Sequence, residues 1–202
     1  PTYSNDNFFC QNITRDTNGR IENVDQPTLN LGGYRTRGID MQVDWQIGLD
    51  AIGIQGNKVL NINSVITYLD SFKLQTTPGG SFTEYAGSIG GAPNALPTWK
   101  AVTTISYGSD VLNLGARWRF LSDMEAAARR TNPLSSTPGV PSYSLFDLFG
   151  SVKVSDDFTL RGGINNVANK QPLVLNGTSG TTDPSSYDVI GRSLFIAATA
   201  KF

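Results

Sequence analysis

The residues best suited to chemistry in this 202-residue chain form a small set, because the sequence has no histidine and a single cysteine. Without histidine the chain supplies no Ser-His-Asp or Cys-His catalytic group and no histidine-ligated zinc site. Its one thiol, Cys10, is either free or half of a pair whose other half lies elsewhere. We therefore expect no catalytic residue, no cofactor and no metal site.

Two carboxylates, Asp40 and Asp44, are close in sequence, and paired carboxylates are the groups that glycoside hydrolysis requires. They lie on one segment, however, and no partner groups shape a cleft around them, so we expect no enzymatic use. The 16 basic and 17 acidic residues leave a net charge of −1. This balance gives no electrostatic reason to expect a nucleic-acid partner.

The segment that carries both carboxylates, residues 39–47, alternates without exception between apolar odd positions and polar even positions. Such a period of two is typical of a β-strand with two different faces. Roughly 9–11 residues of tilted strand cross a membrane. The alternation recurs at residues 60–68, 98–107, 112–120, 146–154, 158–165 and 193–202. We predict an all-β chain, an antiparallel meander of about seven long strands.

The connections between these segments alternate in length. Residues 51–56, 108–110 and 155–157 are short turns, whereas residues 72–97, 122–142 and 169–188 are long and rich in Gly, Pro, Ser, Thr and Asn. Short turns on one side and long loops on the other are typical of a transmembrane β-barrel. A soluble β-sandwich, which has no reason to sort its loops in this way, is the alternative.

Aromatic residues support two membrane interfaces, although aromatic residues are also common in strands generally. One group lies near the short turns and the other near the long loops. The groups are Trp45, Tyr107, Phe158 and Phe202, and Tyr68, Phe72, Trp118, Phe120 and Tyr143.

Four segments resemble TonB-dependent outer-membrane receptors. They are residues 34–40 (Tyr-Arg-Thr-Arg-Gly-Ile-Asp), 96–100 (Leu-Pro-Thr-Trp-Lys), 160–172 (Leu-Arg-Gly-Gly-Ile-Asn-Asn-Val-Ala-Asn-Lys-Gln-Pro) and the tail from Tyr187 to Phe202. The resemblance covers essentially the whole chain. It implies a barrel of 22 strands closed around a plug domain. Such a barrel sits in the outer membrane of a Gram-negative bacterium and imports a siderophore, a glycan or a cobalamin-like ligand by TonB coupling.

Only about seven of those strands are present, so we expect the C-terminal part of the barrel. Residues 1–33 would form an outer loop and extended lead-in, and residues 34–202 the C-terminal strands with periplasmic turns and extracellular loops. The implied partners are the TonB complex, acting through an N-terminal region that is missing here, the missing plug and remaining strands, outer-membrane lipid and a small nutrient, with no nucleic acid. A soluble β-rich adhesion or carbohydrate-binding module is the alternative function.

In a barrel, the polar face of each strand points into the lumen. We place there Asp40, Asp44, Lys100, Arg117, Arg119, Asp147, Lys153 and Arg161. These side chains contact substrate or plug, or they form salt-bridge ladders between strands, which we favour. The loop residues expected to capture substrate are Phe82, Glu84, Tyr85, Arg129 and Arg130.

Two further expectations concern the ends of the chain. Phe202 completes the alternation of the last segment and resembles the C-terminal signal read by outer-membrane assembly machinery. In the oxidising compartment that the resemblance implies, we expect Cys10 to pair with a cysteine upstream of Pro1, a lone thiol being the alternative.

Overall fold

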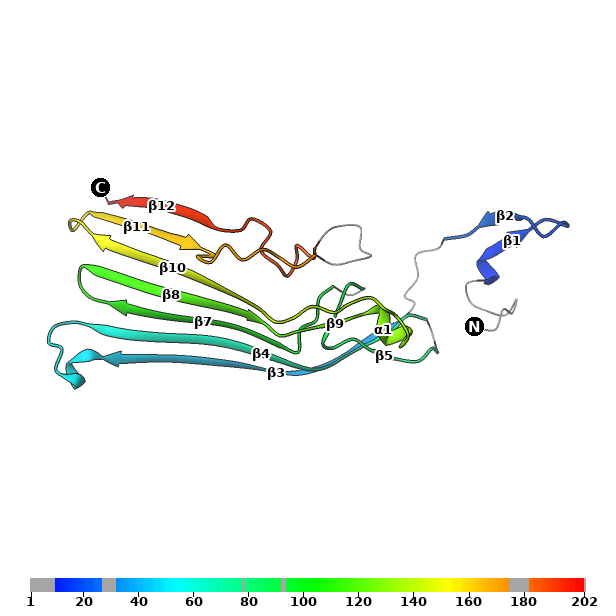
Figure 1. The fold of residues 1–202 in the computed structure, drawn as a ribbon, viewed down its shortest axis with the longest axis horizontal. Helices are drawn as coiled ribbons and strands as arrows, with labels where there is room; N and C mark the ends of the chain where they lie inside the picture. Colours follow the sequence, from blue (N-terminus) through cyan, green and yellow to red (C-terminus); the bar gives the residue numbers. More distant parts are fainter. Residues whose placement is uncertain (1–9, 27–31, 78, 92–93, 175–181, 202) are drawn as a thin grey trace.

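A computed structural model of the chain describes residues 10–26, 32–77, 79–91, 94–174 and 182–201. Its main element is one antiparallel sheet whose long strands follow one another in sequence order (Figure 1). They are β3 (Gly33–Gly48), β4 (Val59–Gln75), β7 (Trp99–Gly108), β8 (Leu112–Leu121), β10 (Tyr143–Lys153), β11 (Phe158–Asn165) and β12 (Ser193–Ala200). The predicted all-β meander is confirmed, and the single layer does not fit the alternative β-sandwich.

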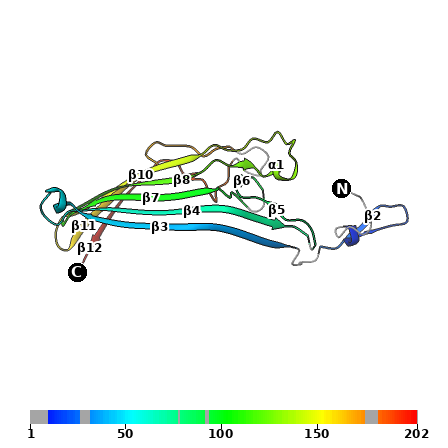
Figure 2. The same ribbon diagram turned by 90° about the horizontal axis from the view of Figure 1, so that it is seen from below.

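Short and long connections alternate as the sequence predicts. The short ones are residues 49–58, which contain the 3₁₀ helix η2 (Leu49–Ile52), and residues 109–111 and 154–157. The long ones are residues 76–98, 122–142 and 166–192. All the short turns lie at one end of the strands and all the long loops at the other (Figures 1 and 2).

The register between the strands gives the sheet one continuous apolar face. Residues that lie directly opposite one another form a row across all seven long strands: Trp45, Ile62, Ile105, Ala116, Leu148, Ile164 and Leu194. Because side chains alternate between faces along a strand, the residues next to these point to the other side. We call the two sides the apolar face and the polar face.

Strands β3 and β4 extend further toward the long loops than the alternation predicts. The register between them shifts at Arg37 and Gly38, so that Asp70 of β4 has no directly opposed partner. Arg37 forms an ion pair with this carboxylate. A Cβ at position 38 would lie 2.5 Å from the Tyr68 carbonyl oxygen, so glycine is required where the strands shift. The shift breaks the period of two, which is why the predicted strands begin at residue 39 and end at residue 68.

A separate hairpin lies in the region expected to be an extended lead-in. It consists of η1 (Cys10–Asn12), β1 (Ile13–Arg15) and β2 (Ile21–Val24). The Asp16 carboxylate closes its turn by accepting hydrogen bonds from the backbone N–H groups of Asn18 and Arg20. In the described ranges Cys10 forms no disulfide, and its pairing with an upstream cysteine stays a prediction.

The hydrophobic core lies at the long-loop end, where the loops pack together. The short strands β6 (Ser88–Ile89) and β9 (Glu125–Ala126) pair in parallel, and α1 (Ala128–Thr131) follows β9. The core residues are Ile89, Leu121, Met124, Val140, Tyr143, Leu145 and Tyr187. Tyr143 is thus buried on the polar side, with its ring edge against Tyr187, rather than in an aromatic belt. We call the packed loops around this core the loop cap.

A further small strand, β5 (Thr83–Glu84), adds to the end of β4 beside the loop cap. Among the described residues, no helix has the length and apolar character needed to cross a membrane. Phe202, the expected assembly signal, lies outside the described residues.

Candidate functional site

The eight charged residues predicted to share a face all lie on the polar face of the sheet. Five positions directly opposite one another form a row of polar side chains across five strands: Asp44, Asn63, Thr104, Arg117 and Asp147. The structure thus brings strands from distant parts of the chain into one polar surface. Their predicted roles in contacting substrate or plug remain predictions.

Asp40 and Asp44 are bonded to neutral groups rather than to each other. Asp44 accepts hydrogen bonds from Asn63 across the strand pair and from Gln42, whose Nε2 lies 2.7 Å away. Asp40 accepts one from the Thr67 hydroxyl at 2.7 Å. The ladder on β3 and β4 therefore consists of carboxylates with amide and hydroxyl partners, and these two carboxylates have no opposed acid or base.

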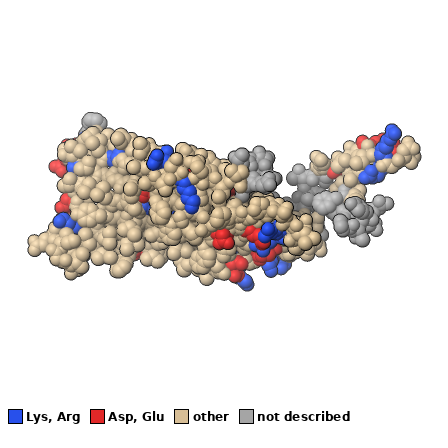
Figure 3. Space-filling model, viewed as in Figure 1, with Lys and Arg blue, Asp and Glu red and all other residues tan. Residues whose placement is uncertain are grey.

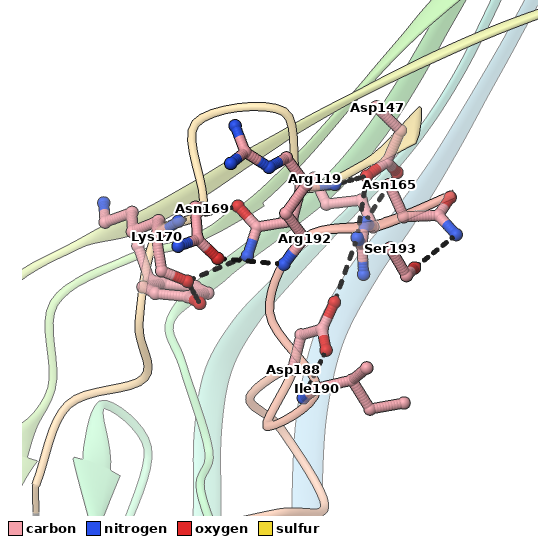
Figure 4. A network of polar contacts seen from close by, with 11 residues as sticks. Arg119, Asp147, Asn165, Asn169, Lys170, Asp188, Ile190, Arg192 and Ser193 are labelled. Atoms are coloured by element: carbon pink, nitrogen blue, oxygen red, sulfur yellow. Dashed lines mark hydrogen bonds and ion pairs between the residues drawn. The ribbon is translucent and has the colours of Figure 1, made fainter. Parts of the chain in front are cut away.

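The strongest polar cluster joins β8 and β10 to the loop that precedes β12 (Figure 4). Nε and Nη2 of Arg119 donate to the two carboxylate oxygens of Asp147 at 3.0 and 2.9 Å. The Asp188 carboxylate lies 3.6 Å from the same Nη2 atom. Only 5% of the Asp147 side chain is exposed, so this is a charge pair held largely away from water. Here the predicted salt bridge between strands is present.

The remaining charged residues of the polar face do not all form ion pairs. Lys153 binds Asp156 at 2.8 Å beside a short turn, and this contact lowers the pKa of Asp156. Lys100 and Arg161 have no ion pair or hydrogen bond with the described residues, and Arg117 has only the Phe149 ring, 5.9 Å from its guanidinium carbon. The salt-bridge ladder is therefore partial.

Asn166 is a site residue that the sequence analysis did not single out. It is completely buried, and its backbone has a φ of +50°, a left-handed conformation that asparagine tolerates. Its side chain exchanges two 2.8 Å hydrogen bonds with the backbone of Lys170, and its N–H donates to Asp147 at 2.8 Å. The Asn-Asn pair at the end of a predicted strand was the available signal for such a turn.

The same turn positions the lead into β12. Asn169 also has a positive φ, of +51°, and its side-chain oxygen accepts a hydrogen bond from the Arg192 N–H at 3.1 Å (Figure 4). Asp188 accepts one from the Ile190 N–H at 3.0 Å. Segment 160–172, on which part of the resemblance rests, thus forms a corner that connects three strands.

Glu84 holds one end of the loop cap together. Its carboxylate accepts hydrogen bonds from the Ser71 hydroxyl at 2.5 Å and from the N–H groups of Phe72 and Ala86 at 2.7 and 2.9 Å. Burial disfavours the charged form, but these bonds outweigh it and lower the pKa of Glu84. Beside it, Tyr85 is buried, and the Arg35 guanidinium lies 4.0 Å from the centre of the Phe82 ring.

Arg129 and Arg130 hold the other part of the cap. They lie 3.6 and 3.7 Å from the two carboxylate oxygens of Glu125, and Arg130 also donates to the carbonyl of Ala86 at 2.9 Å. Figure 3 shows acidic and basic side chains gathered at this end of the sheet. All five predicted loop residues therefore lie in the cap with partners from the chain itself, and ligand contact by them remains a prediction.

Long antiparallel strands with one apolar face, short turns at one end and long loops at the other define a segment of a transmembrane β-barrel wall. The family model described as "TonB dependent receptor-like, beta-barrel" matches residues 5–167, and the chain belongs to this family. The predicted fragment of a TonB-dependent receptor barrel is confirmed. The comparison with curated proteins gives no match.

Membership assigns the chain to proteins that transport nutrients across the outer membrane of Gram-negative bacteria and that are not enzymes. In this family the TonB complex and a nutrient ligand are the general partners.

Proposed function

We propose that this chain forms the C-terminal part of the barrel wall of an importer that takes up a scarce nutrient by TonB coupling. The apolar row across seven strands carries the proposal, because a membrane requires one uninterrupted apolar surface. The polar face then lines the lumen.

The two outermost strands support a larger barrel. Among the described residues, β3 pairs with β4 alone and β12 with β11 alone. Lipid does not tolerate unpaired backbone groups, so a membrane sheet must close on itself. The remaining strands of the receptor supply those pairings, and a plug domain fills the enclosed lumen.

The orientation follows from the loops. Residues 34–202 are the C-terminal strands, with their short turns in the periplasm and their long loops outside the cell, and residues 1–33 belong to an outer loop. The loop cap then faces the medium and receives a siderophore, a glycan or a cobalamin-like ligand. Phe82, Glu84, Tyr85, Arg129 and Arg130 belong to that cap.

Labelling of single cysteines on intact cells tests this orientation in the full-length receptor with Cys10→Ser. Leu134 is 93% exposed in a long loop, and the Asp156 side chain is 95% exposed in a short turn. A membrane-impermeant maleimide should label Leu134→Cys on intact cells and Asp156→Cys only after the outer membrane is opened. Reversed labelling would overturn the orientation.

Uptake tests the transport function itself. Cells that depend on the receptor should take up its nutrient only when TonB is present. A receptor that assembles in the outer membrane but supports equal uptake without TonB would contradict the proposal. Recovery of the full-length protein in the soluble fraction would instead favour the adhesion or carbohydrate-binding alternative.

A further inference from the structure

The apolar face has a gap in one of its rows. Two positions beyond Trp45 toward the short turns, the residues directly opposite one another are Ile47, Leu60, Tyr107, Leu114, Gly150, Gly162 and Ile196. Five strands thus present a large side chain at this level, whereas β10 and β11 present glycine. Glycine inside a strand lowers stability, and it often marks a place where a ligand or another chain approaches closely.

A groove of about 310 Å³ lies over the two glycines. Leu114 of β8 forms one wall, and a Cβ at Gly150 would lie 2.7 Å from its Cδ2 atom. Ile196 of β12 forms the other, and a Cβ at Gly162 would lie 3.4 Å from its Cγ1 atom. Both walls therefore lean over the glycine floor. The groove continues into the next row toward the short turns, which consists of Leu112, Val152 and Leu160.

The groove is formed entirely by strands of this chain. Its floor lies on β10 and β11 and its walls on β8 and β12, which are consecutive in the sheet. The strands that close the barrel pair with the outer edges of β3 and β12, beyond these walls, and a plug domain lies on the opposite, polar face. Completion of the receptor therefore leaves the groove open toward the membrane.

The width of the groove selects its occupant. Neighbouring strands are about 4.7–4.9 Å apart, so the backbones of β8 and β12 are separated by about 14–15 Å. The side chains of Leu114 and Ile196 occupy part of that width from both sides. A helix with its side chains is about 10–12 Å across and is too wide for the space that remains. A single hydrocarbon chain is narrow enough, and the outward-facing side chains that line the groove are all apolar.

We propose that this groove binds one acyl chain of a phospholipid. The chain lies along β10 and β11 over the two glycines, in the half of the apolar face nearer the short turns. The inference rests on the proposed function, because the apolar face must lie in a membrane and the short turns in the periplasm. The lipid then belongs to the periplasmic leaflet.

Close packing is what holds the chain there. Within a membrane there is no hydrophobic driving force, since lipid tails are as apolar as leucine. A chain in the groove contacts the floor and both walls, whereas a chain on an even part of the face contacts protein on one side only. More dispersion contacts therefore favour the groove over other positions around the barrel.

Photo-crosslinking tests the site with the full-length receptor in vesicles of phosphatidylethanolamine and phosphatidylglycerol. A trace of phosphatidylethanolamine carries a diazirine in the middle of one acyl chain, and mass spectrometry locates the labelled residues. Normalised for exposed side-chain area, labelling should be higher at Leu114 and Leu160 than at Ile47 and Leu60 of the same face.

Val152→Phe places a ring in the groove. It should lower labelling of Leu114 and Leu160 about threefold, since it removes several contacts with the chain. Val43→Phe is the matched control, because it is the same change on the same face outside the groove, and it should leave labelling there unchanged. Heat-modifiable migration on gels verifies that each variant is folded.

Three results would overturn the inference. They are even labelling over the whole apolar face, an equal loss in Val43→Phe, and a disulfide-linked dimer of a Leu160→Cys variant with Cys10→Ser, which would assign the groove to a second copy of the receptor. Even labelling with intact TonB-dependent uptake rejects this site alone. Labelling of the polar face instead of the apolar face would reject the proposed membrane wall itself.

Discussion

Asp147 lies directly opposite Arg117 on the neighbouring strand, yet its carboxylate binds Arg119, two residues further along β8. The Asn166 N–H donates to the same carboxylate from the loop-cap side, and Asp188 attracts Arg119 in the same direction. The Asp147 carboxylate therefore accepts its hydrogen bonds from groups on the loop-cap side, namely Arg119 and Asn166. Arg117, directly opposite, has no ion pair with the described residues, and its guanidinium lies beside the Phe149 ring.

Replacing Asp147 with asparagine should destabilise the receptor. The change leaves Arg119 with only the more distant Asp188 carboxylate and weakens the bond to Asn166. We expect a loss of about 1.5–3 kcal/mol in the free energy of unfolding, the range for hydrogen bonds to charged groups. Denaturant unfolding of the receptor in lipid vesicles, followed by tryptophan fluorescence, measures it.

Asp156→Asn is the control for that measurement. It also removes a carboxylate from an ion pair, but the Asp156 side chain is 95% exposed, and exposed pairs contribute little. We expect no measurable change. A larger effect at Asp156 than at Asp147 would contradict the assignment of the buried pair as the one that holds the strands to the loops.

The assignment of faces predicts opposite outcomes for two adjacent residues. Val43 lies on the apolar face and Gln42 on the polar face. An arginine at position 43 would face lipid, where a cation near the middle of the membrane costs about 2–4 kcal/mol, and should reduce assembly. Gln42→Arg should be much milder. Equal amounts of both variants in outer-membrane fractions would show that the faces are wrongly assigned.

On the polar face the Phe149 ring lies across Gly115 of the neighbouring strand, which predicts an interaction between this glycine and this ring. Gly115→Ala forces the Phe149 ring to move and should cost about 1–3 kcal/mol, as overpacking does. In a Phe149→Ala background the same change should cost much less. Gly162→Ala, whose Cβ would lie 3.2 Å from the Phe195 carbonyl oxygen, should be milder. Costs that are additive for positions 115 and 149 would contradict the contact.

Acid should loosen the loop cap through Glu84. Its pKa is lowered in the folded protein from an ordinary value of 4.5, so its stabilising contribution is complete above that pH and is lost as the pH falls through the lower folded-state value. The protection of the cap amides against hydrogen exchange, corrected for the intrinsic exchange rate at each pH, should therefore fall as the pH is lowered below 4.5. Glu84→Gln should make exchange in this pH range less dependent on acid. An unchanged pH dependence in that variant would assign the loosening to other groups.

Tyr187 should respond to alkali instead. Burial, the Asp183 carboxylate and Tyr143 raise its pKa to about 12 from a value of 10.0, so the fold favours the neutral phenol. Stability of the cap should fall as the pH rises from 10 to 12, because only the unfolded state loses this proton. Its hydroxyl has no hydrogen-bond partner in the part of the chain that the structure describes. Tyr187→Phe should thus remove the alkaline effect without loss of stability at neutral pH.

Tyr143→Phe is the companion to that experiment. The Tyr143 hydroxyl donates to the Lys170 carbonyl at 3.3 Å, so its removal should cost about 0.5–1.5 kcal/mol. Thermal unfolding and absorbance of tyrosinate at high pH follow both variants. A greater loss at neutral pH from Tyr187→Phe than from Tyr143→Phe would mean that the Tyr187 hydroxyl has a partner outside the described residues.

The strands could be predicted because most residues of each strand are apolar on one face and polar on the other, although Phe149 and Phe195 lie on the polar face. Residues 39–47 follow this pattern without exception, and the seven-strand row confirms the result. The alternation of apolar and polar residues is interrupted where the register shifts at Gly38, so it does not predict the parts of β3 and β4 beyond that point. The one sign of such a register shift in the sequence is the glycine it requires, Gly38, and a single glycine does not indicate a shift.

The loop cap could not be predicted, because its contacts are made between distant segments. Strands β6 and β9 have two residues each, too few for any periodicity. The composition of the loops suggested capture of a ligand, yet Glu84 and Arg130 have partners within the chain. The positions of Asp188 and Asn166 beside the Arg119 pair likewise depend on how the chain returns after β11.

The parallel pairing of β6 with β9 bears on how receptors of this kind can diversify. Gly87 and Ile89 accept hydrogen bonds at 2.8 Å from Glu125 and Ala127 of the neighbouring loop, so neither loop completes its own backbone bonding. A graft that replaces one loop alone removes the partner of the other. Recombination that preserves these bonds therefore exchanges residues 76–142 together, including β7 and β8, which lie between the two loops. A change in the surface formed by these loops is then accompanied by a change in two strands of the sheet.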